Sequence, residues 1–308
     1  MSFLFRAVVL GEETGVFGVL RDFLFRLGLR GSHCTQNIED IRGVIESDVF
    51  PVVFIDHAPG VNEGFQIYES LRKTEGFELL PFFFFVADQN SVLRKFGDSL
   101  GAKGTISKPF NPSELSILLG PIFSNQSVAI HQRALATSKA ILSHDYEQAL
   151  RGLTALESTP YYSRAAGIAL SRIMVSLSRY SLAEKKLSEL LKNNPADLRC
   201  LCEVADLFIL SNKYPDAIKI FAKLENLDPR ITVKLWDHFH LLISIDDING
   251  ASKVLERMLK APNQKQATIS ALLRMMEFMG LPEIAPLLAR HFPQLAKKYP
   301  LPTNKEAI

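Results

Sequence analysis

The sequence predicts an α/β domain followed by an all-α array of helical repeats. In the first 120 residues, three short runs (7–10, 52–55 and 82–86) are apolar throughout, as in strands of a parallel sheet covered on both faces. Amphipathic stretches separate these runs, which is the alternation typical of a doubly wound sheet. From about residue 130 the strand pattern disappears, and alanines recur at intervals of 34 residues. The two parts of the chain are therefore expected to fold differently.

The first part is expected to contain five strands alternating with five helices. Weaker strand signals lie at 33–35 and 105–106, and helical patterns cover 16–27, 38–45, 65–72, 92–100 and 112–119. Asn111 and Pro112 open the last helix with an N-cap residue and a proline at the first helical position. Functional residues of such a sheet gather at the carboxyl ends of the strands, so a site is expected there.

The second part is built on a 34-residue repeat, which is the period of helix–turn–helix tetratricopeptide units. A bulky residue stands three positions before each of the first four alanines, and prolines close the first four units. The repeated positions are Ala149, Ala183, Ala217, Ala251 and Ala285, preceded by Tyr146, Tyr180, Tyr214 and Ile248. This part resembles the tetratricopeptide-repeat (TPR) family over most of residues 130–297. The resemblance implies about five helix pairs, stacked into a solenoid whose groove binds an unknown protein or peptide.

Composition narrows the classes of function. The chain has 308 residues, of which 47% are hydrophobic and 22% charged, with a formal net charge of +2. Its basic residues are scattered rather than clustered, so nucleic acid is not an expected partner. No apolar run reaches the roughly 18 residues that cross a bilayer, and the N-terminus lacks the pattern of a signal peptide. With only three cysteines, a cytoplasmic protein without membrane association is expected.

One aspartate at a strand end stands out. Asp56 directly follows the apolar run 52–55, and the chain then turns through Ala58, Pro59 and Gly60. Other residues in register with it are Gly64, Gly101, Ala102, Lys108, Pro109 and Phe110. On these residues, the first part resembles the receiver domain of bacterial two-component response regulators over nearly all of residues 4–120.

The resemblance implies a flavodoxin-like five-stranded parallel sheet and a phosphoryl-transfer site. Asp56 would be the phosphoacceptor for a histidine kinase, and Lys108 would contact the phosphoryl oxygens. Mg²⁺ would be held by Glu12, Asp56 and the backbone carbonyl of Ala58. Phosphoryl transfer depends mainly on positioning and charge neutralisation, and Mg²⁺ accepts a few carboxylates together with water and phosphate.

The sequence departs from the family pattern at three positions. Gly11 stands where the family has the first of two acidic residues after strand one. Val86 replaces the hydroxyl residue that ends the fourth strand, and Thr105 replaces the aromatic residue three positions before the lysine. In the family, the hydroxyl and aromatic residues transmit phosphorylation to the surface of the domain. The resemblance is therefore to an atypical, degenerate receiver.

These observations favour a non-enzymatic adaptor of two-component signal transduction. Its expected parts are a receiver-like domain (1–122), a polar linker (123–129) and TPR-like repeats (130–308). The receiver-like domain would dock on a histidine kinase or take its phosphoryl group, as in a phosphorelay. The alternative is a scaffold or homodimer that uses a pseudo-receiver without phosphate. A third interpretation remains open, in which Asp56 is a structural residue of an unrelated sheet protein.

Overall fold

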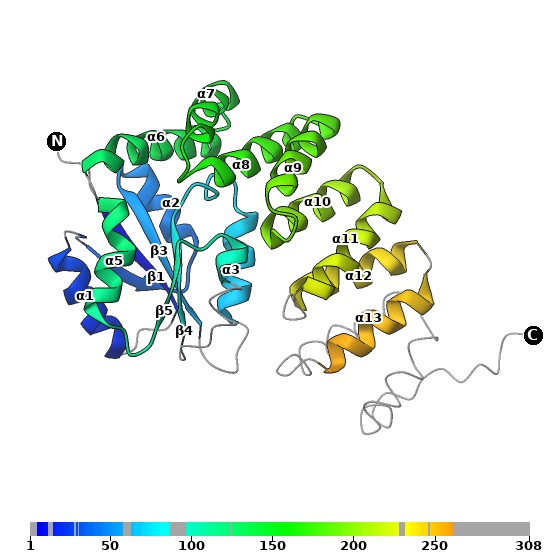
Figure 1. Cartoon of the computed structure of the whole chain (residues 1–308), viewed down its shortest axis with the longest axis horizontal. Helices are drawn as coiled ribbons and strands as arrows, with labels where there is room; N and C mark the ends of the chain where they lie inside the picture. Colours follow the sequence, from blue (N-terminus) through cyan, green and yellow to red (C-terminus); the bar gives the residue numbers. More distant parts are fainter. Residues whose placement is uncertain are drawn as a thin grey trace, which may run out of the picture. The chain divides into compact units, whose positions relative to one another are not determined.

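The computed structural model describes residues 5–11, 15–27, 29, 31–57, 63–86, 97–123, 125–227, 232–245 and 247–260 (Figure 1). The chain divides into two compact units, Met1–Lys213 and Tyr214–Ile308. The first unit contains a sheet with its helices and a further set of helices that follow it in the chain. The part of the second unit that the structure describes is helical.

The sheet has five strands, as the sequence predicts. All the strand pairs are parallel, in the order β2-β1-β3-β4-β5. The strands are β1 (Phe5–Leu10), β2 (His33–Thr35), β3 (Phe50–His57), β4 (Phe82–Val86) and β5 (Gly104–Ser107). The four phenylalanines and the valine of β4 are all buried, because helices cover both faces of a doubly wound sheet.

Helices lie on both sides of this sheet. Figure 1 shows α1 and α5 on one side and α3 on the other. These helices and α2 also match the prediction, with bounds of α1 (Gly15–Arg26), α2 (Glu39–Glu46), α3 (Glu63–Lys73) and α5 (Pro112–Phe123). Of the expected helix at 92–100, residues 97–100 are helical and the rest lie outside the described residues. The expected N-cap of α5 is confirmed, since Asn111 Oδ1 accepts a hydrogen bond of 2.9 Å from the Ser113 N–H.

The predicted linker at 123–129 is largely helical instead. Helix α5 ends at Phe123, and α6 (Asn125–Leu142) begins two residues later. The Ser127 hydroxyl donates a hydrogen bond of 2.7 Å to the carbonyl oxygen of Pro121 in α5. A short polar stretch is compatible with a linker and also with the start of a helix, where serine and asparagine are favoured. Tertiary contacts of α6 decide between the two.

The helices after α6 follow the 34-residue period. In the first unit they are α7 (Tyr146–Glu157), α8 (Ser163–Ser176), α9 (Tyr180–Asn193) and α10 (Leu198–Leu210); in the second they are α11 (Tyr214–Leu227), α12 (Thr232–Ser244) and α13 (Ile248–Lys260). Helices α7, α9, α11 and α13 thus begin 34 residues apart. The repeated alanines within them are buried: Ala149, Ala183, Ala217 and Ala251. The fifth alanine, Ala285, lies outside the described residues.

The turns that join these helices repeat as well. His144, Ser178 and Asn212 all have a left-handed φ of 56° to 58°. Just after each, a backbone N–H returns to a carbonyl five residues earlier, as in Arg179 to Met174 at 2.7 Å. This six-to-one hydrogen bond is that of a Schellman motif, which satisfies carbonyls at a helix end. The repeat is thus a repeat of backbone geometry and not only of residue type.

Helices α6 to α8 pack at the end of the sheet where the strands begin. The His131 ring of α6 lies against Phe5 and Phe50, which open β1 and β3, with ring centroids 5.8 and 5.1 Å apart. Lys103, just before β5, donates a hydrogen bond of 2.6 Å to the carbonyl of Tyr161, in the turn before α8. Helices thus cover the end of the sheet where the strands begin, which we call the amino-terminal edge. Asp56 lies at the opposite end, where the strands finish, which we call the carboxyl edge.

Candidate functional site

The structure brings Asp56 and Lys108 together at the carboxyl edge of the sheet. Asp56 lies near the end of β3, and Lys108 follows β5, where its backbone N–H donates to the Val86 carbonyl at 2.8 Å. The Lys108 ammonium donates a hydrogen bond to Asp56 Oδ1. The two side chains remain 16% and 21% exposed, so the ion pair stays in contact with solvent. A carboxylate beside a fixed cation is thereby presented at the surface.

The order of the strands explains why the pair forms there. The chain leaves β1 toward β2 on one side and continues from β3 toward β4 on the other. Ligand sites of doubly wound sheets lie at this switch point, outside the carboxyl ends of the strands. Gly11, directly after β1, and Asp56, next to last in β3, lie at this switch point, because β1 and β3 pair side by side. This topology brings Asp56 and Lys108 into hydrogen-bond contact, although they are 52 residues apart in the sequence.

Gly11 packs directly against Asp56. A Cβ atom added to Gly11 would lie 2.8 Å from the Cβ of Asp56, well inside van der Waals contact. The backbone around Gly11 is held by neighbours on β2: its N–H donates to the Thr35 carbonyl at 3.1 Å, and its carbonyl accepts from the Cys34 thiol at 3.4 Å. The position that carries an acid in receiver domains therefore has no room for a side chain in this backbone arrangement.

The metal ligands implied by the resemblance are only partly within the described residues. Glu12 and Ala58 lie outside them, so that Asp56 is the one expected ligand that the structure places. Within the described residues, no group of three or more His, Cys, Asp or Glu side chains is arranged to hold a metal ion. The Asp56 carboxylate is already neutralised by Lys108. The described residues alone thus offer Mg²⁺ a single, paired carboxylate.

Val86 and Thr105 are both buried beside this site. Their side chains are 2% and 6% exposed. The Thr105 hydroxyl has no hydrogen-bond partner among the described residues. It also lies close to the backbone of Gly97, since a Cβ there would come within 2.6 Å of Thr105 Oγ1. Neither position holds a bulky side chain that could swing between a buried and an exposed conformation.

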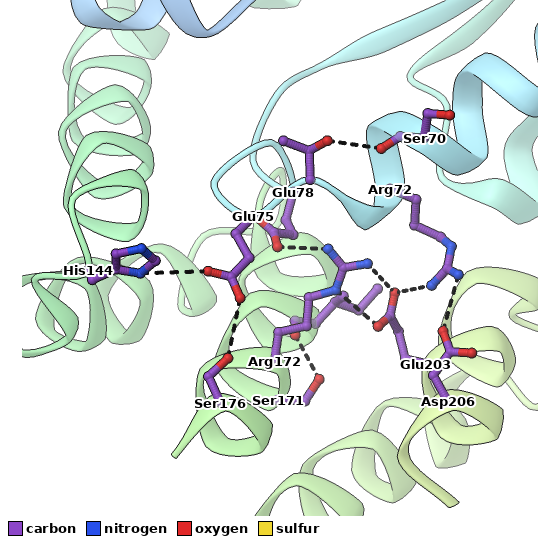
Figure 2. A network of polar contacts seen from close by, with 12 residues as sticks. Ser70, Arg72, Glu75, Glu78, His144, Ser171, Arg172, Ser176, Glu203 and Asp206 are labelled. Atoms are coloured by element: carbon purple, nitrogen blue, oxygen red, sulfur yellow. Dashed lines mark hydrogen bonds and ion pairs between the residues drawn. The ribbon is translucent and has the colours of Figure 1, made fainter. Parts of the chain in front are cut away.

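A second polar cluster, which sequence reasoning missed, lies near the opposite edge of the sheet. The ionic cluster consists of Arg72, Glu78, Arg172, Glu203 and Asp206, drawn from α3, the loop before β4, α8 and α10 (Figure 2). The Glu203 carboxylate accepts a hydrogen bond of 2.8 Å from Arg72 and two hydrogen bonds, of 2.7 and 3.0 Å, from Arg172. Arg172 also reaches Glu78, at 2.8 Å, and Arg72 reaches Asp206, at 3.1 Å. The sheet domain and helices α8 and α10 are joined through these charges.

The charges of the cluster sustain one another. Burial alone would raise the pKa of Glu203, but Arg172 and Arg72 outweigh it and hold that pKa well below the ordinary value. Burial alone would lower the pKa of Arg172, and Glu203 and Glu78 instead raise it. A signal was present in the sequence, because Glu203 stands in the apolar helix LRCLCEVADLFIL. Its partners, more than 100 residues earlier in the case of Arg72, were not identifiable from sequence.

Comparisons with protein-family models, with curated proteins and with solved structures found no match. None of the helices that the structure describes is long and apolar enough to cross a membrane.

Proposed function

We propose that this chain is a two-component signalling adaptor whose receiver-like domain accepts a phosphoryl group on Asp56 from a histidine kinase. The observation that carries the proposal is the ion pair of Asp56 and Lys108 at the switch point of a doubly wound parallel sheet. The pair combines an acceptor oxygen with a cation for the transferred charge, and both groups are in contact with solvent. Phosphoryl transfer requires little more from a protein than such positioning and charge stabilisation.

The reaction would proceed at the free oxygen of Asp56. A carboxylate oxygen attacks the phosphorus of the phosphohistidine, the phosphorus–nitrogen bond breaks, and its electron pair returns to the imidazole nitrogen. Lys108 then exchanges the carboxylate for the phosphoryl oxygens, which carry more negative charge. Mg²⁺, held by Asp56 together with Glu12 and the Ala58 carbonyl, would supply further charge neutralisation when bound.

The environment of Asp56 favours acceptance without transmission. Val86 and Thr105 are buried, and the Gly11 backbone packs so closely against Asp56 that no side chain fits there. A phosphoryl group on Asp56 would thus meet no hydroxyl at position 86 and no mobile aromatic residue at position 105. In this proposal the domain draws phosphoryl groups from the kinase, or docks on it, and the response does not depend on a conformational switch.

The helical repeats would supply the partner interaction. Helices that begin 34 residues apart, with a buried alanine in each, support a TPR-like solenoid. Such arrays use their concave surface to bind extended peptides or protein segments. Joining a kinase-facing domain to a partner-binding array gives the chain the organisation of an adaptor, acting without a DNA-binding or enzymatic output domain.

The acceptor role is tested by a phosphotransfer assay on the full chain. The protein is incubated with Mg²⁺ and acetyl phosphate, or with a panel of autophosphorylated histidine kinases, and its intact mass is measured. Wild type should gain one phosphoryl group that hydroxylamine removes, whereas Asp56→Asn should gain none. Lys108→Met should gain it more slowly, and Lys139→Met, which changes a lysine far from Asp56, should behave as wild type. No label on wild type from any donor would refute the acceptor role.

A phosphate-independent scaffold is the second candidate function. It is favoured by the close contact of Gly11 with Asp56 and by the neutralisation of Asp56 by Lys108. In this case the receiver-like domain would serve as a contact between two copies of the chain. Size-exclusion chromatography with light scattering distinguishes the candidates, because a scaffold forms an oligomer that beryllofluoride, Mg²⁺ and Asp56→Asn leave unchanged.

A further inference from the structure

A small cavity lies at the amino-terminal edge of the sheet, away from Asp56. Its volume is about 120 Å³, which exceeds the space that a single water needs. The loops before β4 and β5 form one wall, and the start of α8 and one residue of α10 form the other. The polar side chains that line it are Glu78, Lys103, Tyr161, Tyr162, Arg164 and Arg199.

The lining carries three cations and one carboxylate. Arg164 is held in place by Asp197, which accepts two hydrogen bonds of 2.5 Å from its guanidinium, and by the Ser99 carbonyl at 2.8 Å. Gly101 allows this placement: its φ is +95°, and a Cβ there would meet the Arg164 guanidinium at 2.5 Å. Lys103 lies over the Tyr161 ring, 3.8 Å from its centroid. The positive groups are thus fixed close to one another.

Burial and mutual repulsion both disfavour the charged forms of these cations. Burial, followed by the charges of Arg164 and Arg199, lowers the pKa of Lys103 to about 8. Burial also lowers the pKa of Arg199. The single carboxylate of the lining, Glu78, already pairs with Arg172 through one oxygen. An anion inside the cavity would relieve this unbalanced charge.

Three polar atoms of the lining have no hydrogen-bond partner among the described residues. They are Arg199 Nε, the Tyr161 hydroxyl oxygen and Glu78 Oε2. Arg199 is 6% exposed, and its Nε is buried from water at the protein surface. Buried polar groups are nearly always paired with protein, water or ligand. Two of these groups donate a hydrogen bond and the third, a carboxylate oxygen, accepts one.

We propose that this cavity binds inorganic phosphate, the small oxyanion that offers both acceptor oxygens and a proton. Lys103, Arg164, Arg199 and the Tyr161 hydroxyl would donate to its oxygens, and its remaining O–H would donate to Glu78 Oε2. Sulfate has the same shape but carries no proton at neutral pH, so it would leave Glu78 facing a bare oxygen. A phosphate ester needs room for its organic group, which a cavity of about 120 Å³ does not provide.

The proposal is tested by isothermal titration of the full chain at pH 7 and constant ionic strength. Inorganic phosphate should bind, and sulfate and glycerol 3-phosphate should bind at least about tenfold more weakly, since each loses a hydrogen bond to a charged group or its fit. Affinity should fall as the pH rises above about 8, because Lys103 loses its proton. The other titratable groups that line the cavity with Lys103 are Arg164, Arg199, Tyr161, Tyr162 and Glu78.

Variants of the lining residues test whether phosphate binds in this cavity rather than elsewhere on the chain. Tyr161→Phe removes only a hydroxyl and should weaken phosphate about tenfold; Lys103→Met and Arg199→Met should weaken it further. Glu78→Gln should remove the preference for phosphate, since an amide N–H donates a hydrogen bond to a sulfate oxygen. Lys139→Met, on α6 outside the lining, should leave the affinity unchanged.

Two results would overturn the proposal. One is a wild-type chain that binds phosphate no more tightly than sulfate. The other is phosphate affinity that persists in Tyr161→Phe and Lys103→Met but disappears in Lys108→Met, which would place the anion at Asp56 instead. Because the cavity and Asp56 lie at opposite edges of the sheet, this outcome is independent of whether Asp56 accepts a phosphoryl group.

Discussion

The two edges of the sheet use charged residues in opposite ways. At the amino-terminal edge, Arg72 and Glu203 are buried, and together with Arg172, whose side chain is 16% exposed, they join α3 to α8 and α10. At the carboxyl edge, Asp56 and Lys108 form one ion pair that stays in contact with solvent. Removing one partner of a buried charge network leaves an uncompensated charge and is costly, whereas a single, partly exposed pair contributes less.

This difference assigns the two edges different tasks. In the proposed phosphoryl transfer, Asp56 needs a neighbouring cation to offset the transferred charge, and Lys108 lies in place to do so. The ionic cluster instead joins the sheet domain to α8 and α10 within one compact unit, Met1–Lys213. Reaction at one edge and cohesion at the other are then separable by mutation.

The largest expected effect is at the buried edge. Glu203→Ala leaves the buried Arg72 and the partly exposed Arg172 without their shared carboxylate, so the free energy of unfolding should fall by about 3–5 kcal/mol. Urea denaturation of the full chain, followed by circular dichroism, measures it. As a control, Glu147→Ala removes the exposed pair with Arg151 and should cost less than about 0.5 kcal/mol. Equal effects of the two variants would remove the distinction between buried and exposed charges.

Acid should weaken the same edge through His131. Burial lowers the pKa of His131 to about 4, whereas the unfolded chain has a value near 6.5. The unfolded state therefore binds the proton first, and stability that is complete above pH 6.5 is lost as the pH falls toward 4. The loss should be on the order of 3 kcal/mol.

The check is the unfolding free energy of wild type and His131→Gln between pH 4 and 7. Glutamine does not titrate, so the variant should have a shallower slope across this range. An identical pH dependence in the two proteins would mean that His131 is not held neutral by its surroundings.

Crowding of Asp56 at the carboxyl edge should lower the free energy of unfolding by less than the loss of Glu203 does. Gly11→Ala places a methyl group against the Asp56 side chain and should destabilise the chain by about 1–3 kcal/mol. Gly43→Ala is the matched control, because Gly43 lies within α2 with nothing within 4 Å of an added Cβ. That change should stabilise by roughly 0.5–1 kcal/mol. If Gly11→Ala instead stabilised the chain, the site would have room for a side chain, as the corresponding site of receiver domains has.

The smallest expected effect compares two repeats within the first unit. Asp145 caps α7 by accepting a hydrogen bond of 3.1 Å from the Gln148 N–H. Arg179, 34 residues later, makes no side-chain cap to α9. Asp145→Ala should therefore cost about 1 kcal/mol and Arg179→Ala close to nothing, as measured by thermal unfolding. The reverse order would contradict the capping assignment.

Periodic features were predictable from the sequence, and pairings between distant residues were not. The run FFFFV matched β4 residue for residue, and the repeated alanines fixed the 34-residue spacing of α7, α9, α11 and α13. Hydrophobic periodicity carries this information locally. The linker prediction was wrong because polar composition does not distinguish a loop from a helix start.

The site was predictable in part, for a physical reason. Parallel topology brings strand ends together, so Asp56 and Lys108 were expected to lie close, and they do. The contact of Gly11 with Asp56 depends on backbone positions that no local pattern encodes. The pairing of Arg72 with Glu203 depends on how helices of the array pack against α3, which residue types alone do not specify.

We propose that Asp56 reacts without a response at the opposite edge of the sheet. Hydrogen exchange of the full chain, with and without Mg²⁺ and beryllofluoride, tests this proposal, with Asp56→Asn as the control. We expect new protection in wild-type peptides that contain Asp56 and Lys108, and none in peptides of α8 and α10. Altered exchange in α8 and α10 that Asp56→Asn abolishes would contradict the account, because it would show that the two edges are coupled.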